Sequence, residues 1–97
     1  MASHEMERIR NAILDRRYTL TEHAYDEMEE DHLDVLDVES AILTGEIDKV
    51  LTMDPRGTRY VVLGNATDQE TPVSVVVRFV EHDQLRCYAV VGSGSRI

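Results

Sequence analysis

The chain has 97 residues, of which 42% are hydrophobic, and it carries a formal net charge of −9. This length is typical of one domain, with enough apolar residues for one small core. The single cysteine, Cys87, excludes an intrachain disulfide and a cysteine-based zinc site. The first 20 residues lack an apolar signal segment, and no apolar run approaches the roughly 18 residues of a membrane span. We therefore expect a cytoplasmic protein without a membrane segment.

The negative charge is concentrated in the first half of the chain. Residues 1–45 contain 12 acids and 4 bases, whereas residues 46–97 contain 7 acids and 6 bases. Nonspecific RNA binding depends on Lys and Arg next to phosphates, so the chain as a whole would be repelled. An RNA-binding surface would have to be local and to lie in the second half. The simpler interpretation of the acidity is a solvated face, and a high-salt habitat is compatible with it.

Residues 5–17 are predicted to form the first helix, with Ser3 as its N-cap. Arginines at its end suit the negative pole of a helix. The apolar positions form one stripe at helical spacing, consisting of Met6, Ile9, Ile13 and Leu14.

Residues 22–30 are predicted to form the second helix, with Thr21 as N-cap. Leu20 and Tyr25 have the spacing of a hydrophobic staple, which would turn Tyr25 toward the core.

Residues 35–44 are predicted to form the third helix. Asp34 is the expected N-cap, and Asp37 lies at the third helical position. Gly45 is expected to end this helix in the left-handed conformation.

After Gly45 the hydrophobic period changes from 3.6 to 2, which indicates strands. The third strand is the most apolar and is expected to be central. The connections are short, so consecutive strands should pair antiparallel. The predicted strands are residues 47–53, 58–65, 72–81 and 85–91, with turns at 54–57 and 82–84 and a loop at 67–70.

The predicted fold class is therefore α+β, with about three N-terminal helices packed on one face of a curved four-stranded antiparallel sheet. Residues 1–97 form a single domain in this interpretation, and residues 92–97 are a flexible tail.

His23 is the first candidate for chemistry. It lies in the first turn of the second predicted helix, where the dipole favours a neutral imidazole, while Asp26 and Glu27 act in the opposite direction. One interpretation is a general acid or base in an RNA cleft. The other is a structural histidine that ties the helix to the sheet.

Arginines and tyrosines of the strands are the second group of candidates. Arg78 interrupts the most apolar strand, where a cation must be paired, lie on an open face, or meet a ligand. Arg59 and Tyr60 are neighbours on one strand, and Arg86 and Tyr88 should share a face of another. Such a surface could hold a phosphodiester and stabilise its transition-state charge. Cross-strand ion pairs are the structural alternative.

Other chemistries have weaker support. The histidines His4, His23, His32 and His82 show no H-x-x-x-H or H-E-x-x-H spacing, so we expect no metal and no cofactor. Cys87 is expected to be a buried, inert thiol.

Short motifs spread from Tyr18 to Val91 resemble a small bacterial family, domain of unknown function 4258. Residues 1–17 would then be an extra N-terminal helix outside the family-like core. The motifs are Thr21-Glu22-His23-Ala24, Met28, Leu33, Val38, Ala41-Ile42, Gly45-Glu46-Ile47, residues 59–64 and residues 72–77.

That family is similar to the RelE/BrnT type of toxins, which are compact α+β proteins that cleave mRNA without a metal and are silenced by an antitoxin. The resemblance implies His23 and Arg78 as catalytic residues, with Arg59, Tyr60, Arg86 and Tyr88 as substrate contacts. It also implies an antitoxin-like protein partner, in some members one with a zinc finger.

The chain departs from the family at three positions. Members commonly have basic residues where this chain has Glu27 and Asp31, and a histidine at the position of Ser74. Acids beside an RNA site oppose RNA binding. The departures leave three interpretations: this chain has lost RNA cleavage, the family has a function other than RNA cleavage, or the acids reflect adaptation to salt.

Two functions are therefore compared below. The first is a toxin-like, metal-independent ribonuclease or a degenerate relative of one. The alternative is a non-catalytic protein-binding module whose acidic helical face docks a basic partner. A homodimer through the sheet edge or the N-terminal helix is compatible with either function.

Overall fold

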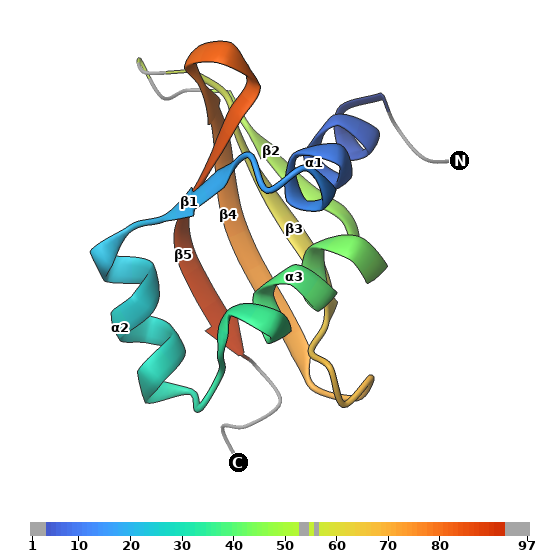
Figure 1. The fold of residues 1–97 in the computed structure, drawn as a ribbon, viewed down its shortest axis with the longest axis vertical. Helices are drawn as coiled ribbons and strands as arrows, with labels where there is room; N and C mark the ends of the chain where they lie inside the picture. Colours follow the sequence, from blue (N-terminus) through green and yellow to red (C-terminus); the bar gives the residue numbers. More distant parts are fainter. Residues whose placement is uncertain (1–3, 53–54, 56, 93–97) are drawn as a thin grey trace.

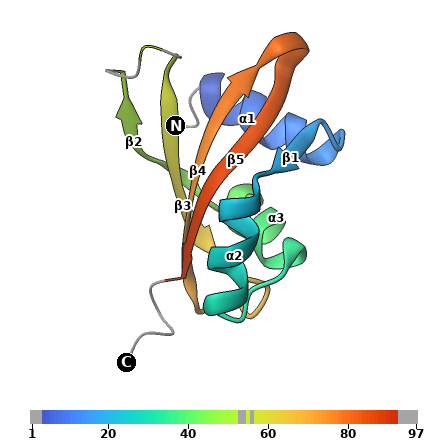
Figure 2. The same cartoon turned by 90° about the vertical axis from the view of Figure 1, so that its left-hand side faces the viewer.

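The computed structural model describes residues 4–52, 55 and 57–92, which form an α+β fold. Its helices are α1 (His4–Leu14), α2 (Glu22–Glu30) and α3 (Val35–Thr44). All three lie on one side of a five-stranded sheet, as the two views show (Figures 1 and 2). The strands are β1 (Tyr18–Leu20), β2 (Glu46–Leu51), β3 (Arg59–Asn65), β4 (Pro72–Val80) and β5 (Gln84–Gly92), with a 3-10 turn, Glu81–Asp83, before the last.

The sheet corrects the prediction of four antiparallel strands. Its order is β1-β5-β4-β3-β2, and β1 pairs parallel to β5. The predicted first helix ran to residue 17, whereas α1 ends at Leu14 and the backbone turns at Arg16, where φ is 59°. The parallel pairing extends past β1, because Leu85 N–H donates to the Arg17 carbonyl and Thr21 N–H to the Cys87 carbonyl.

The remaining strands form the expected antiparallel meander, and β4 lies in the middle of the sheet. Helices cover one face of β4, where Val73, Val75 and Val77 are fully buried. Val76 and Arg78, which point to the opposite face, are half-buried. The apolar composition of this strand therefore reflects its central position rather than helices on both faces.

Strand bounds differ from the predictions by one or two residues, and β5 takes in Gly92, which was expected in the tail. Residues 93–97, part of the turn at 54–57, and the predicted N-cap Ser3 lie outside the described residues.

The core fills the space between the helices and one face of the sheet. Met6, Ile9 and Ile13 of α1 are buried in it as predicted. Leu14 is exposed because the helix ends there, and Tyr25 is exposed as well, so the prediction that it faces the core is wrong.

Side-chain caps fix the starts of α2 and α3. Thr21 Oγ1 accepts from Ala24 N–H, and Asp34 and Asp37 form a reciprocal capping box. Asp37 also accepts from the backbone and hydroxyl of Thr67, which ties α3 to the loop between β3 and β4. Burial acts to raise the pKa of Asp37, but the hydrogen bonds from Thr67 and Asp34 hold it below its ordinary value.

Two glycines allow α3 to approach β3 at backbone distance. Gly45 has φ −93°, so the predicted left-handed cap is wrong. A Cβ on Gly45 would lie 2.5 Å from the Ala41 carbonyl oxygen, and a Cβ on Gly64 would lie 1.9 Å from it. Since both obstacles are backbone, the contact between α3 and β3 requires glycine at these positions.

Replacement of Gly64 by alanine should therefore lower the free energy of unfolding by about 3 kcal/mol, because helix and strand must move apart. Gly92→Ala is the matched control: its Cβ would meet the movable Leu33 Cδ1 at 3.1 Å. We expect that variant to lose less than about 1 kcal/mol. Urea unfolding followed by circular dichroism measures both, and equal losses would contradict the close-approach explanation.

Candidate functional site

The face of the sheet opposite the helices collects most of the predicted site residues. Residues paired across neighbouring strands share a face. Since the buried residues mark the helix side, the strand register identifies the residues on the opposite side. We call it the open face. Its members are Lys49, Leu51, Arg59, Val61, Leu63, Ser74, Val76, Arg78, Arg86, Tyr88, Ala89 and Val91.

Tyr88 is the centre of a three-strand cluster on the open face. The guanidinium carbons of Arg59 on β3 and Arg78 on β4 each lie 5.2 Å from the centroid of its ring. At this distance a cation is attracted by the ring, so Tyr88 holds both guanidinium groups close together. Arg86 is the cross-strand partner of Arg78 and is exposed.

A bulge in β5 shapes this cluster. Val77 pairs with Cys87 and Val76 with Ala89, which leaves Tyr88 as the extra residue. A bulge redirects side chains without breaking the strand. Tyr88 and Arg86 share a face, as predicted, although simple alternation is interrupted.

The open face is also where the positive charge of this acidic protein collects. Lys49, Arg59, Arg78 and Arg86 all belong to it. Arginines near the N-terminus form the ion pairs Arg8–Asp83, Arg10–Glu46 and Arg17–Asp15. The sheet therefore supplies the local cationic surface that RNA binding would need.

His23 lies on α2, away from the arginine–tyrosine cluster. Its side chain is 70% exposed, and its Nε2 is 3.5 Å from Glu27 Oε1. The two predicted catalytic residues thus make different contacts, His23 with Glu27 and Arg78 with Tyr88. The exposure does not fit a histidine buried as a tie between helix and sheet.

Glu27 and Asp31 have a structural role that the sequence did not reveal. Beyond β1, the outer edge of β5 is covered by α2: Val90 N–H donates to Glu27 and Gly92 N–H to Asp31, each at 2.9 Å. Thr21 Oγ1 completes this edge by donating to the Tyr88 carbonyl. These two acids satisfy backbone donors, so their presence is no argument about RNA.

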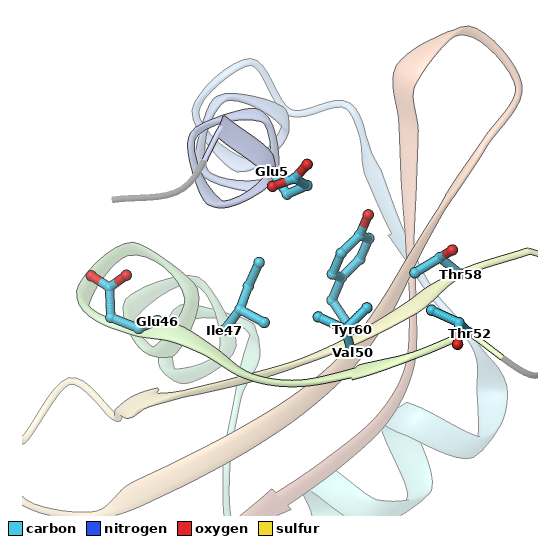
Figure 3. Close-up of a pocket in the computed structure, with 7 residues that line it drawn as sticks. All are labelled: Glu5, Glu46, Ile47, Val50, Thr52, Thr58 and Tyr60. Carbon is cyan, nitrogen blue, oxygen red and sulfur yellow. The ribbon is translucent and has the colours of Figure 1, made fainter. Parts of the chain in front are cut away.

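Tyr60 is separated from the other predicted substrate contacts. It alternates with Arg59 along β3 and so points to the helix side, where it lines a pocket of about 590 Å³ between α1 and β2 (Figure 3). Figure 3 shows Ile47, Val50 and Tyr60 on the floor of this pocket and Glu5 of α1 above them. Arg59 and Tyr60 cannot contact one substrate group together.

The buried Cys87 and the half-buried Tyr18, on neighbouring strands, have raised pKa values. The prediction that the Cys87 thiol is buried is confirmed. Burial raises the pKa of this thiol to about 12. Burial, followed by a hydrogen bond to Glu39 and the charge of that carboxylate, raises the pKa of the Tyr18 phenol.

Within the part of the chain that the structure describes, no three His, Cys, Asp or Glu side chains gather as metal ligands would. Among the same residues, no helix is long and apolar enough to cross a membrane.

The comparisons with known proteins identify the family. The family described as Domain of unknown function (DUF4258) matches residues 20–91, which is most of the chain, and the chain belongs to it. No curated protein and no solved structure gave a match. The match includes α2, α3 and β2–β5, whereas α1 precedes it.

Two features were not predicted from the sequence: the place of Lys49 on the open face, and the hydrogen bonds from the outer edge of β5 to Glu27 and Asp31. The pairing of Lys49 with Val61 places it on the open face, but a bulge between Ile47 and Lys49 hides this from simple alternation. The acids of α2 gave no signal of their role, because their partners are backbone groups more than 60 residues away.

Replacing Asp31 by alanine should lower the free energy of unfolding by about 2 kcal/mol, since it leaves the Gly92 N–H buried without its acceptor. Asp31→Asn keeps an acceptor oxygen and should lose less. Glu30→Ala, at an exposed neighbouring position, is the control and should stay within about 0.5 kcal/mol. Thermal unfolding of the three variants is the measurement; an Asp31→Ala protein as stable as the control would contradict the role.

Proposed function

We propose that this protein is a toxin-like, metal-independent ribonuclease, or a degenerate relative of one, that binds RNA on the open face and is controlled by an antitoxin-like protein. The observation that carries the proposal is the pair of guanidinium groups, from Arg59 and Arg78, gathered on the ring of Tyr88. Two guanidinium groups held close together on a sheet can both donate to the anionic oxygens of a phosphodiester.

The chemistry needs little more than charge stabilisation and two proton transfers. In metal-free RNA cleavage the 2′ oxygen attacks phosphorus and the bond to the 5′ oxygen breaks, which leaves a cyclic phosphate. The 2′ hydroxyl loses its proton to a base, and the 5′ oxygen gains one from an acid. Arg59 and Arg78 would stabilise the negative charge that develops on the phosphoryl oxygens.

His23 is the proposed acid–base group, because it is exposed and an imidazole can both accept and donate a proton. Its Nε2 lies 3.5 Å from Glu27 Oε1, and this oxygen accepts from Val90 N–H, two residues along β5 from Tyr88. RNA bound to the open face would therefore have to pass the outer edge of β5 to reach this imidazole.

A second candidate function has its own observation. The acids of α2 that do not protect β5 are exposed, and α2 contains no Lys or Arg. A basic partner protein would find a continuous acidic surface there. In that case the protein would be a non-catalytic binding module and the open-face arginines would have a structural role. The exposed acids are Glu22, Asp26, Glu29 and Glu30.

RNA affinity should depend on Arg59 and Arg78. Each phosphate contact to single-stranded RNA contributes about 0.7 to the slope of log K against log salt. Replacing both Arg59 and Arg78 by alanine should therefore reduce this slope by about 1.4 and weaken binding most at low salt. Fluorescence anisotropy with a labelled single-stranded oligonucleotide measures the slope.

Arg16→Ala is the matched control for that experiment, since it removes an exposed arginine at the end of α1. Its slope should equal that of the unmodified chain. Tyr88→Phe keeps the ring beneath both guanidinium groups and should leave affinity within about twofold. Equal slopes for the double variant and the control would place RNA elsewhere.

The next prediction concerns activity in cells. If the protein cleaves RNA, its expression without a partner should arrest bacterial growth, and His23→Ala should relieve the arrest. His32→Ala, another exposed histidine, is the control and should remain toxic. Soluble expression that leaves growth unchanged would reject the ribonuclease and leave the binding module.

A further inference from the structure

The sheet has one long edge at β2, because β2 is the outermost strand on the side opposite β1. The strand is mostly exposed, with Val50 at 51% and Leu51 at 44% of their full accessibility. An edge strand presents backbone donors and acceptors that can pair with another chain. Apolar side chains on such an edge indicate a surface that becomes covered.

The bulge makes the pattern of β2 symmetric about its own centre. Ile47 pairs with Val62 and Val50 with Tyr60, so both point to the helix side, as Figure 3 also shows. Between them lie Asp48 and Lys49, which together occupy the place of one residue at the bulge. Reading the strand in either direction therefore gives the same order: an apolar residue, a charged pair, and an apolar residue.

We propose that β2 pairs antiparallel with β2 of a second copy of this chain, around a two-fold axis that passes through the bulge. This arrangement places Ile47 opposite Val50 of the other copy, and Asp48 opposite Lys49 of the other copy. Both pairings occur twice, as the symmetry of a homodimer requires. The apolar pairs lie on the helix side, next to the pocket floor formed by Tyr60.

The charges select this partner among others. An aspartate, a lysine and a bulge on an edge discourage pairing with an unrelated strand. In a second copy the same two charges are complementary. Exposed ion pairs contribute little affinity, so Asp48 and Lys49 fix the register, while the apolar pairs and the backbone ladder supply most of the binding energy.

The dimer also extends the proposed function, and this step rests on that proposal. A two-fold axis perpendicular to the sheet keeps both open faces on the same side. The surface that carries Arg59, Arg78 and Arg86 would continue into that of the second copy, with Asp48 and Lys49 of each near the axis. A single-stranded RNA longer than one subunit could then contact both copies.

The test is the molar mass of the full chain by light scattering and by sedimentation over a range of concentrations. The expected value at high concentration is twice the 11.0 kDa of one chain. Asp48→Lys and Lys49→Asp each place like charges opposite one another and should raise the dissociation constant about tenfold. The double variant Asp48→Lys/Lys49→Asp restores complementary charges and should return it to within about threefold.

Two further variants complete the design. Asp26→Lys makes the same charge change on α2 and should leave the mass unchanged, whereas Val50→Asp should give monomers; circular dichroism checks that each is folded. A monomer at all concentrations, or a dimer insensitive to both single charge variants, would overturn the proposal. If the chain is monomeric and replacing Arg59 and Arg78 still abolishes RNA binding, the dimer is rejected and the proposed function is retained.

Discussion

The structure depends on how the outer edge of β5 is closed. This strand lies between β4 and β1, but β1 has three residues and pairs with only the first part of it. The backbone donors beyond are satisfied by side chains of α2, through Glu27 and Asp31. A buried N–H without an acceptor is costly, so these contacts fix where α2 sits and leave the opposite edge, β2, as the longer free one.

That arrangement divides the charges of the molecule by function. Several acids of the helical half serve the fold: Glu27 and Asp31 accept hydrogen bonds from β5, and Asp34 and Asp37 cap α3. Other acids are exposed on α2. On the helix-free side, Arg59 and Arg78 gather on the ring of Tyr88. The net charge of −9 therefore says little about what the open face binds, since the two surfaces lie on opposite sides of one sheet.

Much of the fold could be predicted from the sequence because local signals were strong. Thr21 and Asp34 begin α2 and α3 as their cap chemistry requires, and the change of period after Gly45 marks the sheet. The parallel strand β1 could not be predicted, since three residues are too few for a period-2 pattern and its partner is more than 60 residues away. The prediction of a left-handed Gly45 was wrong for a related reason. This glycine allows α3 to approach β3 closely, and that contact depends on the tertiary structure rather than on the local sequence.

Residues of the candidate site could be predicted where alternation along a strand determines on which face of the sheet a side chain lies. Arg86 and Tyr88 lie on one face as expected, whereas Tyr60 lies on the opposite face because it directly follows Arg59. The position of Lys49 depends on the bulge between Ile47 and Lys49, which pairs two residues with one and leaves no clear mark in the sequence. His23 matches the family-like motif, but its distance from the arginines is set by how α2 packs on β5, which sequence periodicity does not encode.

The place of β5 within the sheet has a consequence for how the chain folds. β5, which follows the other described strands in the chain, lies between β1 and the rest of the meander, so β1 and α2 have no sheet to pair with until β5 is in place. The contacts that join β5 to β1 and α2 span more than 60 residues and therefore close large loops. Contacts of this length form slowly, which makes insertion of β5 the step that commits the chain to its native structure.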